Sequence, residues 1–82
     1  MHEQGLARDL VTYAETAAGD TTVRSMRLEI GVLSGVAPDH LRAAIESEAR
    51  SRWGAVPSLE ILVAQDPAAR GAGGVLLVGV GV

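Results

Sequence analysis

The sequence predicts an α+β fold in which two helices pack on one face of a small three-stranded sheet, in the order α-β-α-β-β. Two observations predict this fold. Apolar residues recur at helical spacing in residues 3–18 and 38–52, and they alternate with period two in three further segments. The chain has 82 residues, so we expect residues 1–82 to form a single domain.

The first helix is predicted from an apolar stripe and a stop signal. The stripe consists of Leu6, Leu10, Tyr13, Ala14 and Ala17. Gly19 and Asp20 follow as a C-terminal stop and turn.

The second helix has a start signal in its sequence. Pro38 suits the first helical position, where its missing N–H costs nothing, and Asp39 suits the positive end of the helix dipole. Its predicted buried stripe is Leu41, Ala44, Ile45 and Ala49. Glu46 with Arg50 and Glu48 with Arg52 are spaced as i,i+4 ion pairs, and Trp53 is expected to anchor the helix before Gly54 ends it. We expect Arg42, Arg50 and Arg52 to form a solvated face.

Three strands are predicted from alternating side chains. In the first, Met26, Leu28 and Ile30 face one way, and Gly31 closes it. The second strand, Ser58 to Ala64, places Leu59, Ile61 and Val63 on one face. The third, Val75 to Val82, places Leu76, Val78, Val80 and Val82 on one face, with Val75, Leu77, Gly79 and Gly81 on the other.

Residues 65–74 are predicted to form a loop, and the segment after it has two interpretations. Residues 68–82 contain only Ala, Arg, Gly, Leu and Val, which a shifted reading of a GC-rich gene would also produce. The alternation of large residues is what a genuine third strand requires. Both interpretations remain open from the sequence.

Composition excludes several classes of function. The net charge of −3 argues against a nucleic-acid-binding surface. The absence of Cys excludes a disulfide scaffold, a thiolate nucleophile and a Cys-based zinc site. Charged residues interrupt the N-terminal segment, and the longest uncharged apolar tract, 71–82, is shorter than the roughly 20 residues that span a bilayer. We therefore expect a cytoplasmic protein without nucleic-acid or membrane partners.

Catalytic combinations are also few. The chain has two His and neither Cys nor Lys, and the glycines at 71–74 precede no helical pattern that could bind phosphate. His40, in the first turn of the second helix, is expected to be an exposed helical residue. We expect no enzymatic activity.

The first three residues, Met1-His2-Glu3, are a candidate metal site. They combine a free α-amine, an imidazole and two backbone amide nitrogens. An amine and an imidazole both have a substantial unprotonated fraction near neutral pH. Nitrogen donors crowded in this way suit a planar or tetragonal ion, which means Ni(II) or Cu(II). An inert, frayed terminus is the alternative interpretation of the same residues.

Three segments carry a resemblance to a known family: MHEQGLARDLV, VRSMRLEIGVLSGVAPDHLRAAIE and SLEILVAQDP. They resemble the nickel-binding domain of the hydrogenase nickel-incorporation proteins, the HypA/HybF family, over roughly residues 1–67. The resemblance implies that His2 binds nickel, helped by the amine of Met1 and the amide of Glu3. It also implies delivery of Ni(II) to [NiFe] hydrogenase, or to urease, with a nickel-inserting GTPase and the hydrogenase large subunit as partners, and it allows a homodimer.

The chain departs from the family in one respect. The family carries a zinc domain with two Cys pairs between its second and third strands, whereas this chain has no Cys and only the 65–74 loop at that place. The resemblance therefore implies a member that lacks the zinc domain or is truncated, with nickel and no zinc as its metal. The alternative is a degenerate paralogue, or an interaction module of the same fold, without a metal function.

Overall fold

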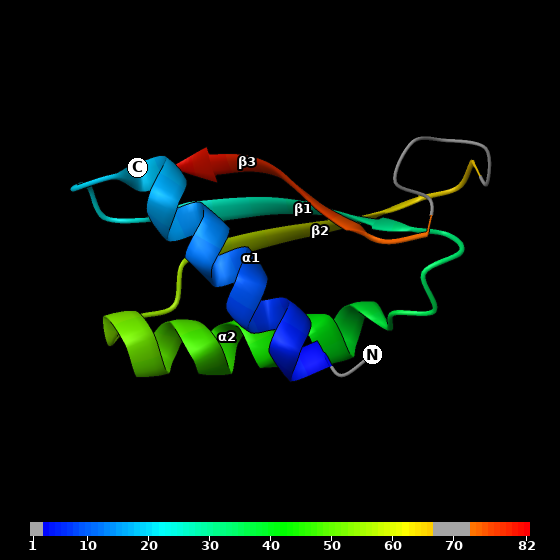
Figure 1. Ribbon diagram of the computed structural model, residues 1–82, viewed down its shortest axis with the longest axis horizontal. Helices are drawn as coiled ribbons and strands as arrows, with labels where there is room; N and C mark the ends of the chain where they lie inside the picture. The colour runs from blue at the N-terminus through cyan, green and yellow to red at the C-terminus, as the bar shows by residue number, and fades with distance from the viewer. Residues whose placement is uncertain (1–2, 67–72) are drawn as a thin grey trace.

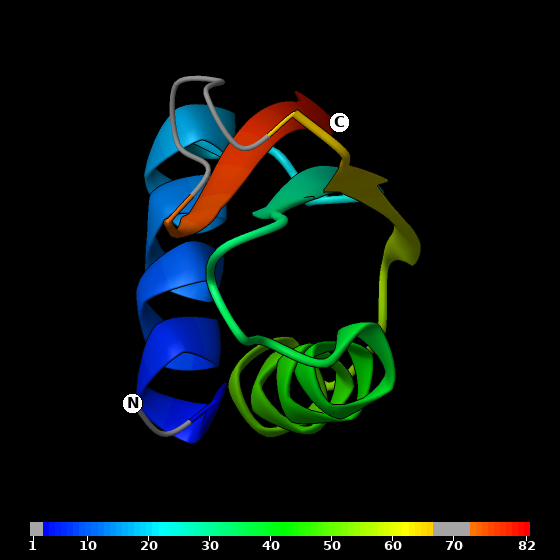
Figure 2. The same cartoon turned by 90° about the vertical axis from the view of Figure 1, so that its right-hand side faces the viewer.

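The structure, a computed structural model, describes residues 3–66 and 73–82. Two helices and three strands follow one another in the predicted order. They are α1 (Glu3–Ala18), β1 (Ser25–Gly31), α2 (Pro38–Trp53), β2 (Ser58–Ala64) and β3 (Val75–Gly81). Figures 1 and 2 show both helices on the same side of the sheet, so the predicted α+β architecture is confirmed. Neither helix in the described ranges is long and apolar enough to cross a membrane.

The sheet has the strand order β2-β1-β3, with β1 in the centre. β1 pairs in parallel with β2, from Ser25 opposite Ser58 to Gly31 opposite Ala64. This parallel pair requires a crossover connection, and α2 provides it. β3 pairs with the other side of β1 in the antiparallel direction. The sheet is therefore mixed, and β1 is the strand whose apolar residues are most completely buried.

β3 contains an irregularity that the alternation did not predict. Leu28 lies opposite Leu77 but the preceding Arg27 lies opposite Gly79, so Val78 is an extra residue without a counterpart on β1. Such a bulge shifts the pleat by one residue. Before it Val75 and Leu77 pack against the core, and after it Val80 does.

The prediction that Leu76, Val78, Val80 and Val82 share one face is therefore wrong at Val80. Leu76, Val78 and Val82 are exposed by 41%, 48% and 62%. Val80 alone of that set packs against the core. A strict period of two cannot describe a strand whose two halves are out of phase.

The buried core lies between the sheet and the two helices. Its apolar members are Ala7, Leu10, Val11, Ala14, Met26, Leu28, Ile30, Leu41, Ile45 and Ala49. The stripe predicted for α1 is partly wrong, because Tyr13 is 60% exposed and Ala17 is exposed, whereas Ala7 and Val11 are buried. α1 contacts α2 as well as β3, so its buried face is turned toward the space between them.

α2 begins and ends close to the predicted residues. Ala37 precedes it in an extended conformation with ψ 126°, and Pro38 stands in its first turn. Gly54 ends it in the left-handed conformation, with φ 71°, and donates its N–H to the carbonyl of Arg50 at 3.0 Å. Glycine adopts this conformation without the steric cost that a Cβ would impose. The helix extends one residue beyond the predicted Arg52.

Candidate metal centre

The predicted nickel ligands lie at the very start of the chain. Met1 and His2 fall outside the described residues, and Glu3 is the first residue of α1. The first N–H groups of an α-helix have no acceptor within the helix. The amide N–H of Glu3 therefore has no acceptor within α1.

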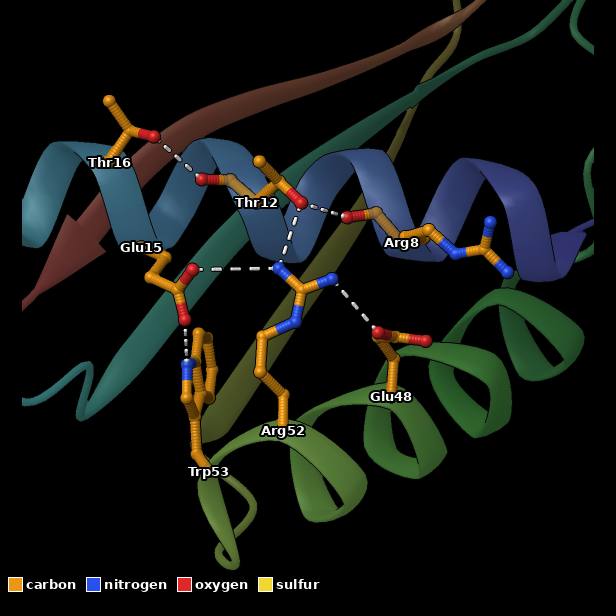
Figure 3. Close-up of polar contacts among 7 residues, drawn as sticks. All are labelled: Arg8, Thr12, Glu15, Thr16, Glu48, Arg52 and Trp53. Atoms are coloured by element: carbon orange, nitrogen blue, oxygen red, sulfur yellow. Dashed lines mark hydrogen bonds and ion pairs between the residues drawn. The ribbon is translucent and has the colours of Figure 1, made fainter.

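Polar side chains attach α1 to α2. Figure 3 shows a polar cluster on the paired helices, which we call the Arg52 cluster; it comprises Thr12, Glu15, Glu48, Arg52 and Trp53. Arg52 donates from Nη1 to the hydroxyl of Thr12 at 2.8 Å and from Nη2 to Oε2 of Glu48 at 3.0 Å. Its Nη1 also lies 3.6 Å from Oε1 of Glu15. One guanidinium thus links Thr12 and Glu15 of α1 to Glu48 of its own helix, α2.

Trp53 and Thr12 extend the same cluster. The indole Nε1 of Trp53 donates to Oε2 of Glu15 at 2.8 Å, so Trp53 anchors α2 to α1 while also packing against the core. The hydroxyl of Thr12 donates in turn to the backbone carbonyl of Arg8 at 2.9 Å. The contacts of Arg52 and Trp53 with Thr12 and Glu15 hold the second half of α1 against the last turn of α2 (Figure 3).

The sequence indicated only part of this cluster. The Glu48–Arg52 pair has the predicted i,i+4 spacing and forms, whereas the described residues contain no ion pair between Glu46 and Arg50. Nothing in the local pattern identified Glu15, because its partners Arg52 and Trp53 are 37 and 38 residues further along the chain. Nor is the cluster itself a metal site, since both of its carboxylates are already engaged by Arg52.

The arginines of α2 differ from the predicted solvated face. Arg50 is exposed, but Arg42 and Arg52 are only partly exposed. Arg42 donates from Nη2 to the carbonyl of Leu59 in β2 at 3.4 Å. Arg42 and Arg52 therefore fasten α2 to its neighbours. Of the three arginines, only Arg50 matches the expectation of a solvated face.

A groove runs between the first half of α1 and α2. Its lining comprises Gln4, Arg8, His40, Ala43, Ala44, Ser47, Glu48 and Ser51. His40 is exposed, as the sequence predicted, and it shares this groove with Gln4 of the first turn of α1. Within the described residues, no three His, Cys, Asp or Glu side chains gather closely enough to hold a metal ion.

Comparison with known proteins gives two relatives that carry the same description. The chain is 40% identical over 47 residues to the hydrogenase maturation factor HypA of Geobacter metallireducens, covering 57% of this chain and 43% of that protein. It is 46% identical over 50 residues to the hydrogenase maturation factor HypA of Streptomyces avermitilis, covering 56% of this chain and 38% of that protein.

The matched segment is thus less than half as long as either relative. No protein-family model matches the chain, and no solved structure matches it significantly. These similarities support a relationship to the HypA proteins over somewhat more than half of the chain.

Proposed function

We propose that this chain is a cytoplasmic nickel-binding protein of hydrogenase maturation. It binds Ni(II) at Met1, His2 and Glu3, delivers the ion to [NiFe] hydrogenase, and performs no catalysis of its own. The observation that carries the proposal is the similarity to two hydrogenase maturation factors, at 40% and 46% identity. Nickel is the cargo of this protein, so the site needs to release the ion as well as bind it.

The donor chemistry of the terminus suits nickel as well as copper. The α-amine, the imidazole of His2 and the two backbone amides are nitrogen donors, which suit planar or tetragonal Ni(II). The amide of Glu3 has no acceptor within α1, so binding would break no helical hydrogen bond. None of these donors is a thiolate, and the absence of Cys therefore removes the family's zinc site without removing the nickel donors.

The partners follow from the same proposal. They are a nickel-inserting GTPase and the large subunit of the hydrogenase, with urease as a second possible target for the nickel. A homodimer is compatible with the exposed apolar side chains of Leu62, Leu76 and Val78 on the sheet. We treat residues 1–82 as one nickel-binding domain, with residues 65–74 at the place of the family's zinc domain.

Isothermal titration calorimetry tests the nickel site. Protein with its native, untagged N-terminus should bind Ni(II), and His2→Ala should abolish that binding because the imidazole is lost. A Gly-Ser extension at the N-terminus should do comparable damage, since it replaces the free amine by an amide. Circular dichroism of each variant controls for folding. Unchanged nickel affinity in a folded His2→Ala protein would contradict the proposal.

Two observations favour a second candidate. The chain contains no Cys, and the matched segment covers less than half the length of each relative. A degenerate paralogue or interaction module would share both properties while having no metal function. It would show no specific nickel affinity but would still bind a maturation partner, so the same calorimetry combined with a pull-down of the GTPase separates the two candidates.

A further inference from the structure

The two edges of the sheet differ in how they are protected. β3 forms one edge, where α1 contacts it and the bulge at Val78 interrupts its pairing with β1. β2 forms the other edge, on the side of the sheet away from α1 (Figure 2). It pairs with β1 without interruption from Ser58 to Ala64 and contains neither Pro nor Lys. Edge strands are commonly shielded by such residues, by bulges or by a covering helix, so β2 is the edge that remains open to further pairing.

Every second residue of β2 turns its backbone groups away from β1. Ser58 donates its N–H to the carbonyl of Arg24 at 3.0 Å, so the backbone groups of Ser58 face β1. Because this direction alternates along a strand, the backbone groups of Leu59, Ile61 and Val63 face the open edge.

These outward groups are only partly satisfied. Arg42 donates from Nη2 to the carbonyl of Leu59 at 3.4 Å, and Gln65 donates from Nε2 to the carbonyl of Val63 at 3.3 Å. Both distances are longer than the usual 2.7–3.2 Å for such bonds, on the order of a few tenths of an ångström. Among the described residues, the outward N–H and C=O of Ile61, between them, have no partner.

The same three residues carry apolar side chains on the core-facing side of the sheet. Leu59 and Ile61 pack against the core but are only partly buried, and Val63 is 40% exposed. A further strand beside β2 would therefore satisfy backbone groups and cover apolar side chains at once.

We infer that two copies of this chain pair through β2, in the antiparallel direction and about a two-fold axis centred on Ile61, so that their sheets join into one. In this register Ile61 lies opposite Ile61 of the partner subunit, and Leu59 lies opposite Val63 of the partner subunit. The outward groups of opposite residues exchange both N–H···O bonds, as in the hydrogen-bonded pairs of an antiparallel sheet. Each of the three apolar side chains gains an apolar neighbour across the junction.

Charge and side-chain pattern select this register over its neighbours. A two-fold axis that keeps both cores on the same side of the joined sheet passes beside one residue of β2. Centred on Glu60, the axis would place two carboxylates directly opposite each other, which is destabilising. Centred on Leu62, it would place Leu59 opposite the polar Gln65. Centred on Ile61, it places Glu60 opposite Leu62, and no like charges meet.

One pair of strands is a small interface. Stable complexes bury about 800 Å² of each partner, and a single pair of seven-residue strands offers less, so the dimer should be reversible and concentration-dependent. The inference builds on the homodimer of the proposed function by assigning its interface, but it requires no nickel.

Sedimentation equilibrium of the metal-free protein tests the dimer, with Val63→Lys and Val78→Lys as a matched pair of variants. Both replace a half-exposed valine, at 40% and 48% exposure, on opposite edges of the sheet. The average mass of the wild type and of Val78→Lys should rise with concentration from 8.5 kDa toward twice that value. Val63→Lys should stay at the monomer mass, because it places a charge opposite Leu59 of the partner subunit. Circular dichroism checks the folding of each variant.

Oxidative cross-linking tests the register, since the wild type contains no Cys. Ile61→Cys should form an intermolecular disulfide, because opposite Cα atoms of a hydrogen-bonded pair lie about 5.5 Å apart, within disulfide range. Leu62→Cys, at a 47% exposed position, should cross-link more slowly, because its counterpart is a diagonal neighbour about 7–8 Å away. This comparison also decides the matter if Val63→Lys does not fold.

Three outcomes overturn the inference: a wild type that stays monomeric, equal dimerisation of folded Val63→Lys and Val78→Lys, or cross-linking of Leu62→Cys at least as fast as that of Ile61→Cys. Each of them leaves the nickel site to be judged separately by the calorimetry of His2→Ala. Loss of nickel binding, in turn, would leave the β2 dimer standing.

Discussion

Removing the Arg52 guanidinium should loosen the attachment of α1 to α2. The substitution Arg52→Ala removes the ion pair with Glu48 at 3.0 Å and the ion pair with Glu15 at 3.6 Å. It also removes the hydrogen bond to Thr12 at 2.8 Å. The Arg52 side chain is 25% exposed and that of Glu48 is 26% exposed, so solvent screens these pairs only in part. Ion pairs at exposed sites contribute about 0.2–1 kcal/mol each, and a hydrogen bond contributes about 0.5–1.5 kcal/mol.

These contributions together predict a loss of about 2 kcal/mol in the free energy of unfolding. For a domain of this size, about 1 kcal/mol corresponds to about 4–8 °C in Tm. Arg52→Ala should therefore lower Tm by about 8–16 °C. Thermal unfolding followed by circular dichroism measures this change, with the urea midpoint as an independent check.

Arg50→Ala is the matched control. Arg50 stands in the same last turn of α2, is exposed, and has no ion pair among the described residues. Both variants lose the same favourable interaction of an arginine with the helix C-terminus, about 0.3–1 kcal/mol, so that contribution cancels in the comparison. The reasoning is refuted if the two variants differ by less than about 0.5 kcal/mol.

Two further predictions concern the core and the end of α2. Leu28→Ala removes a side chain with 0% exposure from the central strand and should lower the free energy of unfolding by about 3 kcal/mol. Leu76→Ala, at a 41% exposed position of β3, should lower it by less than about 1 kcal/mol. Equal shifts in the urea midpoint would show that β1 is not the centre of the core. Gly54→Ala places a Cβ on a residue in the left-handed conformation, at φ 71°, and should lower the free energy of unfolding by about 1–2 kcal/mol. Gly54→Asn should lower it clearly less, because Asn tolerates this conformation better; thermal unfolding measures both variants. A Gly54→Ala protein more stable than the wild type would contradict the assigned cap.

Most of the fold could be predicted because it is recorded in local patterns. The alternation of Met26, Leu28 and Ile30 specifies a half-buried strand, and all three are buried in β1. Pro38 and Gly54 mark the limits of α2, because each has a backbone preference that fits only that end of a helix. These properties belong to neighbouring residues, so the sequence contains them directly.

Two predictions failed where the deciding contact is distant in the sequence. Tyr13 has the spacing of a core residue but is exposed, because the packing of α1 against both α2 and β3 turns the helix toward other residues. Val80 has the alternation that would place it on the same face as Leu76, but the bulge at Val78 reverses the phase between the two ends of β3 and Val80 packs against the core. Neither the helix rotation nor the bulge leaves a mark in the local pattern.

The sequence by itself determined the chemistry available at the candidate site, because Met1, His2 and Glu3 are adjacent in the chain and need no fold to bring their nitrogen atoms together. Only the tertiary structure decided which residues of the two helices meet. Glu15 meets Arg52 and Trp53, and His40 enters the groove next to Gln4, because two helices about 40 residues apart in the sequence pack together. Contacts across such a separation depend on the packing of whole elements around the core, and side-chain spacing along one element does not encode them.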